Sequence, residues 1–325
     1  MQIKKIGILG GSGFVGQSLA NRLTRDGHEL RVLTRDQRLH RANLMVLPTL
    51  ELVECDIHDP AQLNAQLAGC DTVINLVGIL NERGRDGLGF HRVHVELAEK
   101  IVAACRHNGI KRILQMSALN ADAETGTSHY LRSNGKAEVI IHAAAADGIN
   151  VTSYRPSVIF GPGDAFFNRF AGLLRMTPLV FPLACYNARF APVYVLDVVE
   201  MMAKSLGDPG SHGQRYCLCG PRQYTLRDLV RYTAQVKGYP RWILPLGDLP
   251  SRMQAAVFDF VPGKPFSTDN YNSAKMDSIC NRNDLAVYGI TPTPLEAVVP
   301  QYLANRHQRA RYSELRGTSR SRLAG

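Results

Sequence analysis

The chain has no Cys-x-x-Cys pair, no long uninterrupted apolar run and only one tryptophan. Its seven cysteines are scattered, which favours neither a zinc site nor a disulfide framework and therefore suits a reducing compartment. The apolar runs are too short, or too often broken by proline, to span a bilayer. Because a strand and a glycine loop begin almost at Met1, we expect no signal or transit peptide ahead of the fold. These absences favour a cytoplasmic globular protein.

Acidic residues are scarce relative to basic ones, and the formal net charge is +10. Part of the excess lies at residues 306–325, where six arginines face the single acid Glu314. We interpret this stretch as a solvated, disordered tail, with docking on an anionic membrane surface or on a partner protein as the alternative. No aromatic interleaving or nucleic-acid motif accompanies the charge, so we expect no nucleic-acid partner.

Strand-like and helix-like segments alternate through the first half of the chain. This alternation predicts an α/β protein, a Rossmann-type doubly wound parallel sheet with a smaller C-terminal lobe. The predicted strands lie at residues 4–10, 29–35, 50–56, 71–78, 111–117 and 150–160. Predicted helices fill the gaps, at 17–27, 60–69, 94–109 and 135–148, and the last three end in or just before Gly.

The amino-acid composition changes after Gly161, where proline and aromatic residues become frequent. We therefore predict an NAD(P)-binding domain at 1–160 and a smaller substrate or partner lobe at 161–305. A segment at about 190–206 is expected to return to the main sheet, with Asp197 capping the helix that follows. The third predicted part of the chain is the basic tail at 306–325.

The glycine loop follows the first predicted strand and opens the first helix. It consists of Gly10, Gly11, Ser12, Gly13, Phe14, Val15 and Gly16. Glycines in such a loop allow a tight turn, close approach of backbone N–H groups to a pyrophosphate and close packing of the helix on the strand. A glycine motif in this context predicts a nicotinamide dinucleotide site.

Three later strand ends should complete that site. Thr34 and Arg35 stand where an acid would bind the ribose 2′-hydroxyl of NAD, and Arg35 can pair with a 2′-phosphate instead. We therefore favour NADP(H) over NAD(H), with the neighbouring Asp36 as the opposing feature. Asp56 and Ile57 are expected beside the adenine. The fourth strand contributes Leu76, Val77 and Gly78 along the middle of the cofactor.

Taken together, these motifs make the chain resemble an atypical, extended short-chain dehydrogenase/reductase. The resemblance rests on GGSGFVG, CDI, INLVG, SALNAD, YLRS, RPSVIFGPGD and GKPFSTDNYNSAKMDS and covers about residues 3–305. Within that superfamily the chain is most similar to the branch with the NAD(P)H-binding accessory subunit of respiratory complex I. The resemblance implies cofactor contacts at Pro156 and Val158, an epimerase/dehydratase-like fold, and a connection with a respiratory complex or quinone metabolism.

Catalytic members of that superfamily use a Tyr and a Lys four residues later. At about 100° per residue, positions i and i+4 share a helix face and reach the same ring. Here Asn134 stands four residues after Tyr130, and Lys136 stands six residues after it. Aligning Lys136 with the family Lys instead puts Arg132 at the Tyr position. In either register one partner is missing, and which of Asn134 and Lys136 contacts the ribose stays open.

Ser117, at the end of the fifth predicted strand, is the candidate for polarising a substrate carbonyl or lining the cofactor. We expect a nucleotide-binding, oxidoreductase-like protein with weak or no reductase turnover, in which Ser117, Tyr130 and Asn134 also contact the cofactor. The alternatives are an active NAD(P)-dependent reductase or sugar-nucleotide epimerase/dehydratase, and an NADP(H)-sensing regulator.

Three further features are expected to be structural. His91 and His94 lie three residues apart, but two ligands do not hold zinc, and we predict no metal site. Cys217 and Cys219 are expected to pack rather than to perform redox chemistry. The lone Trp242 is expected either to pack beneath the smaller lobe or to form part of its cleft.

Overall fold

The computed structural model describes residues 4–38, 44 and 47–304, so the basic tail lies outside the described residues. The strands are β1 (Lys5–Leu9), β2 (Glu29–Thr34), β3 (Leu50–Glu54), β4 (Thr72–Asn75), β5 (Arg112–Met116), β6 (Asn150–Pro156), β7 (Ile159–Phe160), β8 (Val180–Leu183), β9 (Arg189–Phe190), β10 (Val193–Tyr194), β11 (Arg215–Leu218), β12 (Tyr224–Thr225) and β13 (Trp242–Pro245). The α-helices are α1 (Phe14–Arg25), α3 (Pro60–Leu67), α4 (Leu88–Phe90), α5 (Leu97–Asn108), α6 (His129–Ala143), α7 (Ala165–Met176), α8 (Val195–Ser205), α9 (Leu226–Lys237), α10 (Asp248–Phe258), α11 (Thr268–Ser273) and α12 (Leu295–Leu303). Shorter helical turns are η1 (His91–Glu96), η2 (Ala144–Asp147), η3 (Pro209–Ser211) and η4 (Asp284–Tyr288).

A seven-stranded parallel sheet forms the centre of the larger part, in the order β11-β6-β5-β4-β1-β2-β3. The strand order reverses between β1 and β4, and ligands of open α/β sheets bind at such a reversal. β4 is buried along its whole length, as a strand covered on both faces should be. The predicted fold class, a doubly wound parallel sheet, is confirmed.

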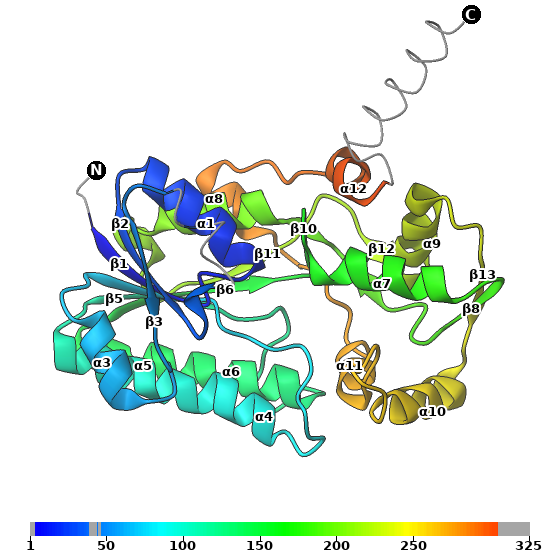
Figure 1. The fold of residues 1–325 in the computed structure, drawn as a ribbon, viewed down its shortest axis with the longest axis horizontal. Coiled ribbons are helices and arrows are strands. Elements are labelled where there is room, and N and C mark those ends of the chain that lie inside the picture. Colours follow the sequence, from blue (N-terminus) through cyan, green and yellow to red (C-terminus); the bar gives the residue numbers. More distant parts are fainter. Residues whose placement is uncertain (1–3, 39–43, 45–46, 305–325) are drawn as a thin grey trace, which may run out of the picture.

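Helices cover both faces of this sheet (Figure 1). On one face α1 and α8 pack with Ile6, Ile8 and Val32 into one apolar cluster. On the other face α3, α5 and α6 pack against residues such as Leu9, Val73 and Ile113. Hydrophobic burial on both sides fixes the strands, so their carboxyl ends form one rigid edge on which a site can be built.

The smaller lobe is built from the second half of the chain. α7, α9 and α12 pack around Phe160, Phe167 and Leu229, and a second cluster joins α7 and α9 to β8. Two short ladders, β12 with β9 and β13 with β8, lie in this lobe, while α10 and α11 lie below it in Figure 1. This lobe therefore has its own apolar clusters beside the main sheet.

The segment predicted at about 190–206 contains helix α8, which packs on one face of the main sheet, while β10 pairs with β7 and the sheet receives β11 from this half of the chain. One local prediction is wrong. Asp197 does not cap α8, whose N-cap is Tyr194; its carboxylate instead accepts hydrogen bonds from the backbone N–H of Thr293 (2.7 Å) and from its hydroxyl (2.9 Å). The role of Asp197 therefore depends on Thr293, which lies almost a hundred residues later in the chain.

None of the helices among the described residues combines the length and the hydrophobicity that a membrane crossing needs.

Candidate functional site

The glycine loop leads from β1 into α1 with the geometry of a phosphate cradle. Gly10 has φ +76°, and a Cβ there would lie 2.9 Å from the backbone carbon of Leu76. A Cβ at Gly16 would lie 2.5 Å from the backbone of Gly11. Neither position accepts a side chain without movement of backbone, so both glycines are structurally required.

The N-terminus of α1 has no side-chain cap. The N-cap residue is Gly13, no side chain forms a capping hydrogen bond, and the first turn contains no acidic residue. The first backbone N–H groups of a helix need an acceptor, and together with the helix dipole they favour an anion. The loop therefore fits a pyrophosphate, with Ser12, Phe14 and Val15 beside Gly13 around it.

The other predicted cofactor residues lie on the same sheet edge. Leu76 directly follows β4, and its N–H donates to the carbonyl of Leu9 at the end of β1 (2.9 Å). Val77 and Gly78 follow it, partly buried and exposed respectively. Asp56 and Ile57 follow β3, and the Asp56 carboxylate accepts the N–H of His58 (2.9 Å). The structure thus brings the ends of β1, β3 and β4 together, as expected for parallel strands.

At the end of β2, Arg35 is exposed and Thr34 is buried. The Thr34 hydroxyl donates to the carbonyl of Asp36 (3.2 Å), and the Asp36 carboxylate accepts the N–H of Arg38 (2.9 Å). Arg38 is also exposed. Two guanidinium groups therefore lie at the strand end where a ribose 2′-substituent is recognised, with the acid bound to the backbone of its own turn.

Tyr130 and Asn134 lie on the first turns of α6, which begins earlier than predicted because Ser128 caps it. Asn134 is buried, and its amide donates to the Tyr130 carbonyl (2.9 Å) and lies 3.4 Å from Nδ1 of His94. His94 in turn contacts the hydroxyl of Ser133 (2.8 Å). Lys136 is exposed. The helix therefore places an amide, and not a cation, beside Tyr130.

The Tyr130 ring forms an aromatic cluster with Phe90 and His94. Its centroid lies 6.1 Å from that of Phe90 and 5.9 Å from that of His94. Loss of solvent, and secondly the charge of Asp269, raise the pKa of Tyr130 to about 12. Burial lowers the pKa of His94 to about 4, so this imidazole is neutral at neutral pH. Nε2 of His94 accepts the N–H of Ile79 (3.4 Å), which joins this cluster to the end of β4.

Ser117 faces a buried ion cluster. Its hydroxyl donates to Glu138 of α6 (3.0 Å), which is only 1% exposed. Glu138 also pairs with Arg155 (3.0 Å) and Arg215 (2.8 Å). No contact between Ser117 and Tyr130 appears among the hydrogen bonds of the described residues, so the structure ties this hydroxyl to the cluster.

Two further predicted cofactor residues lie at the end of β6 and just after it. Pro156 is buried and its carbonyl accepts the N–H of Leu119 (3.0 Å). Val158 is partly buried, and its carbonyl accepts the N–H of Val193 (2.9 Å). These bonds attach the end of β6 to the loop after β5, and Val158 to the start of β10.

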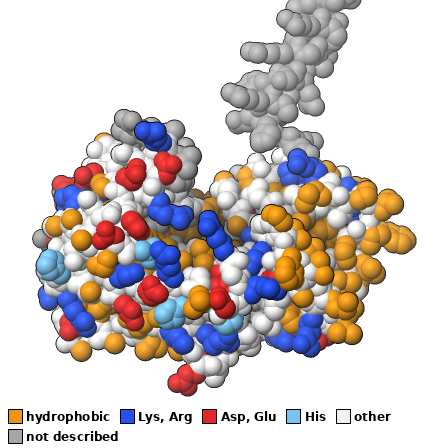
Figure 2. Space-filling model, turned by 60° about the horizontal axis from the view of Figure 1, so that its bottom comes forward, with side chains coloured by type: hydrophobic (Ala, Val, Ile, Leu, Met, Phe, Trp, Pro, Cys, Tyr) orange, Lys and Arg blue, Asp and Glu red, His pale blue; other side chains and the backbone are white. Residues whose placement is uncertain are grey.

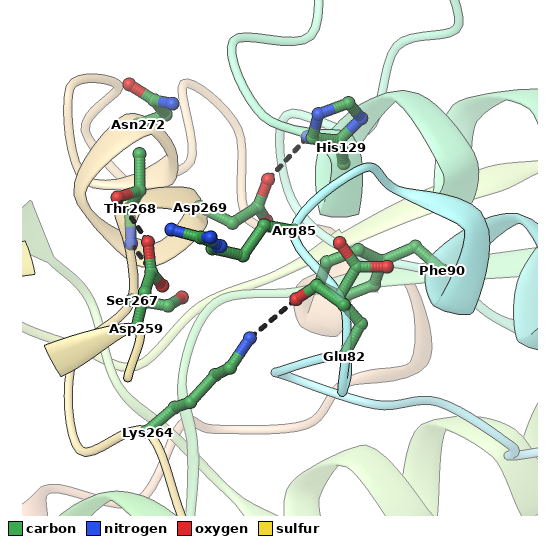
Figure 3. A pocket seen from close by; sticks show the side chains of 11 residues that line it. Glu82, Arg85, Phe90, His129, Asp259, Lys264, Ser267, Thr268, Asp269 and Asn272 are labelled. Atoms are coloured by element: carbon green, nitrogen blue, oxygen red, sulfur yellow. Dashed lines mark hydrogen bonds between the residues drawn. The ribbon is translucent and has the colours of Figure 1, made fainter. Parts of the chain in front are cut away.

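A small cavity lies between the two parts of the molecule, next to the start of α6 (Figure 3). Its lining includes Glu82, Arg85, His129 and Asp269. The Asp269 carboxylate accepts the N–H groups of His129 (2.7 Å) and Tyr130 (3.2 Å). Burial raises the pKa of Asp269, and the two hydrogen bonds oppose that rise. Sequence reasoning missed Asp269, although it lies within the GKPFSTDNYNSAKMDS stretch that carried the resemblance.

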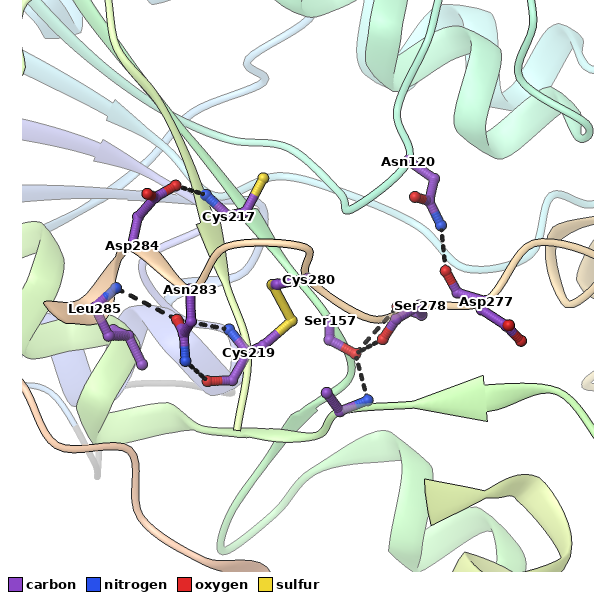
Figure 4. Close-up of a disulfide and its surroundings, with 11 residues drawn as sticks. Asn120, Ser157, Cys217, Cys219, Asp277, Ser278, Cys280, Asn283, Asp284 and Leu285 are labelled. Carbon is purple, nitrogen blue, oxygen red and sulfur yellow. Dashed lines mark hydrogen bonds between the residues drawn. A yellow bond between two sulfur atoms is a disulfide. The ribbon is translucent and has the colours of Figure 1, made fainter. Parts of the chain in front are cut away.

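One of the expectations about the cysteines is wrong. Cys219, at the end of β11, forms a disulfide with Cys280 (Figure 4). The prediction that no disulfide is present and that Cys219 merely packs is therefore wrong. The two residues are 61 positions apart, so no local spacing could have indicated the pair. Cys217 is a free thiol, and burial raises its pKa.

The parallel sheet, the switch point and the glycine cradle define a nicotinamide-dinucleotide-binding protein of the Rossmann type. The model of the NAD dependent epimerase/dehydratase family matches residues 6–219, more than half of the chain. The chain belongs to this family.

Relatives connect the chain with two groups of proteins. It is 27% identical over 295 residues to a mouse protein named NADH dehydrogenase [ubiquinone] 1 alpha subcomplex subunit 9, mitochondrial, with 89% of this chain and 77% of that protein covered. It is 28% identical to a ceramide reductase of Caulobacter vibrioides over 75% of this chain and 74% of the other.

A solved nucleoside-diphosphate-sugar epimerase from Staphylococcus aureus has the same fold. It superposes with a TM-score of 0.71 at 18% identity and covers 90% of this chain and 98% of the epimerase. The predicted resemblance to the atypical short-chain dehydrogenase/reductases, with the complex I subunit among the relatives, is confirmed.

Proposed function

We propose that the protein binds NADP(H) as an oxidoreductase-like protein and has weak or no reductase turnover. The observation that carries this proposal is the environment of Tyr130. The residue one helical turn later is Asn134, whose amide is bonded to a backbone carbonyl, and Lys136 is turned to solvent. A nicotinamide cofactor would supply the hydride, so the protein must supply the proton and the charge that activates it.

Among the described residues, no cation acts on Tyr130 in place of the missing lysine. His94 contacts the Tyr130 ring, but its low pKa of about 4 keeps it neutral, and Asp269 brings a negative charge. A phenol with a pKa of about 12 stays protonated at neutral pH and transfers its proton poorly. This supports binding without efficient chemistry.

The preference for NADP(H) rests on the end of β2. Arg35 and Arg38 are exposed there, and the carboxylate of Asp36 is engaged by the N–H of Arg38. A guanidinium forms a charge-assisted pair with a 2′-phosphate, which NAD(H) lacks. Titration calorimetry with NADPH and NADH tests this directly, and equal affinities would refute the preference.

Turnover is tested by restoring the missing charge. Asn134→Lys should raise NADPH oxidation with generic carbonyl substrates, because a cation then lies one turn from Tyr130. Since Asn134 is buried, this variant should also melt at a lower temperature. Asn134→Gln is the matched neutral control and should leave turnover unchanged. Higher turnover in the Gln variant would show that charge is not the limiting factor.

An active reductase is the second candidate, favoured by the cavity beside His129 and Tyr130, where a small carbonyl compound would meet Asp269. The ceramide reductase relative shows that catalysis occurs among similar chains. Substrate-dependent NADPH oxidation that Tyr130→Phe abolishes would establish this candidate.

We further propose a respiratory-complex or quinone-related role in the cytoplasm, at the inner face of the membrane, with residues 306–325 as an electrostatic tether. The complex I relatives and the six tail arginines support this. Deleting 306–325 should reduce co-sedimentation with anionic vesicles at low salt and leave thermal stability unchanged. Disulfides persist mainly in oxidising compartments, so peptide mapping without reductant tests the location: a Cys219–Cys280 crosslink in protein whose free thiols were blocked at lysis would contradict the cytoplasm.

A further inference from the structure

The smaller lobe carries a broad apolar surface, which we call the apolar face. It extends over the end of α7, the β8–β13 ladder, α10 and the residues after α10, on the right of Figure 2. Its most exposed members are Trp242 at 83%, Leu179 at 76% and Phe260 at 73%. The apolar face comprises Met176, Leu179, Val180, Trp242, Leu244, Leu249, Met253, Val257, Phe260 and Val261. A contiguous exposed apolar area of this kind marks an interaction site.

Helix α10 is inverted relative to an ordinary surface helix. Its buried positions are the small residues Ser251 and Ala255. Its large side chains, Leu249, Met253 and Val257, recur every four residues on the exposed side and are 61–67% exposed. A water-facing helix normally has the opposite distribution. Helix α10 therefore presents its apolar side to something outside the chain.

The neighbouring ladder continues the same surface. Trp242 pairs with Val180 and Leu244 with Pro182, so these four exposed side chains lie on one side of a two-stranded sheet. The chain passes from β13 directly into α10, and the Gln254 amide of α10 donates to the carbonyl of Pro182 (3.2 Å). Ladder and helix are thus joined as one platform.

Three arginines border the apolar face. Arg175 and Arg252 are exposed at its border, and Arg241 is partly exposed beside Trp242. The two acids of α10 and its end are engaged within the lobe: Asp248 accepts the Tyr271 hydroxyl, and Asp259 accepts the hydroxyl and N–H of Thr268. The platform therefore combines large apolar side chains with arginines.

We propose that the apolar face docks on an anionic phospholipid membrane. Trp, Leu, Met and Phe with flanking Arg are the residues that enter the boundary between headgroups and acyl chains. Arginine at the border would meet lipid phosphates. A second copy of this chain is a poorer occupant, because the two-fold pairing of this face would bring the exposed Arg175 and Arg252 of both copies to the same contact. This inference is independent of nucleotide binding and of the basic tail.

Trp242 makes the proposal directly measurable, since it is the only tryptophan in the chain. The full-length protein is mixed with vesicles of phosphatidylcholine that contain about one third phosphatidylglycerol. Trp242 emission should shift to shorter wavelength and be quenched by a nitroxide placed on a shallow acyl carbon. At physiological ionic strength the double variant Met253→Gln/Val257→Gln should partition about tenfold less, because two apolar side chains no longer enter the membrane.

The matched control is Val139→Gln/Val287→Gln, which changes two comparably exposed valines outside the apolar face. It should bind vesicles like the natural protein, and all variants should show the same melting temperature. Equal partitioning of the Met253/Val257 variant and the natural protein would overturn the proposal and leave the charged segments as the cause. Absence of vesicle binding would also overturn it. So would a blue shift of Trp242 without lipid that rises with protein concentration, which would assign the face to a second copy.

Discussion

The glycine loop and the start of α6 lie at one edge of the sheet. The loop has the features that nucleotide binding needs, whereas α6 lacks the lysine that catalysis needs. At the loop, Gly10 and Gly16 leave no room for a side chain and Gly13 leaves the helix end open to an anion. At α6, Tyr130 is present but its partner position holds Asn134, closed in by His94. The comparison indicates that binding and catalysis depend on separate residues, so one can be kept while the other is weakened.

The largest expected effect concerns the loop. Gly13→Asp should abolish nucleotide binding, since a carboxylate would occupy and repel the pyrophosphate position at the N-terminus of α1. The same carboxylate can cap the helix, so the melting temperature should stay equal or rise. Calorimetry and thermal unfolding check the two halves of the prediction. Gly13→Ala is the control and should bind more weakly than the natural protein but measurably; retained affinity in the Asp variant would contradict the cradle.

The second effect concerns stability near Tyr130. The pKa of His94 falls from 6.5 unfolded to about 4 folded, so the unfolded chain binds a proton first as pH falls. The contribution of His94 to the free energy of unfolding should therefore be constant above about pH 6.5 and should decrease by about 3 kcal/mol as pH falls towards 4. Urea unfolding across this range measures it. His94→Gln should remove this part of the pH dependence, while substitution of the exposed His91 by Gln should not. Some pH dependence should remain in His94→Gln, because the pKa of His142 is also lowered to about 4. An unchanged slope in His94→Gln would refute the assignment.

A third effect tests cofactor choice at the loop side of the comparison. Arg35→Asp should weaken NADPH binding about tenfold and reverse the preference towards NADH, because an acid repels the 2′-phosphate and accepts the ribose hydroxyl. Calorimetry with both cofactors measures the ratio. Arg31→Lys serves as the control, since Arg31 lies on β2 but pairs with Glu51 of the neighbouring strand β3. A ratio that Arg35→Asp leaves unaltered would place recognition elsewhere.

The smallest expected effect is at Lys136. Because its side chain is exposed, Lys136→Ala should change cofactor affinity less than about twofold. Titration of the variant beside the natural protein is sufficient. A large loss would show that Lys136, and not Asn134, faces the ribose.

The parts of the fold set by local patterns were predictable from the sequence. Short apolar runs predicted six of the seven strands of the main sheet but did not place β11 in it, and β4 and β6 are shorter than predicted. The glycine loop was predictable because each glycine has a local backbone reason. Tyr130 and Asn134 were placed on one helix, and the structure agrees.

The remainder depends on contacts between distant segments. Asp269 binds the start of α6 from 139 and 140 residues away, and Cys219 finds Cys280 across 61. Ser117 was the candidate for polarising a substrate carbonyl or lining the cofactor, and no local pattern indicated that its hydroxyl donates to Glu138. Trp242 was expected to pack beneath the smaller lobe or to form part of its cleft, but its side chain is 83% exposed. No periodicity in a single segment carries such information.

The central claim is that this chain binds NADP(H) while Tyr130 lacks the charge that would activate it. The most direct test is the rate of NADPH oxidation, at saturating cofactor and with generic carbonyl substrates, for the natural protein and for Tyr130→Phe. We predict that both rates equal the background. Robust oxidation by the natural protein that disappears in Tyr130→Phe would contradict the claim and establish an active reductase.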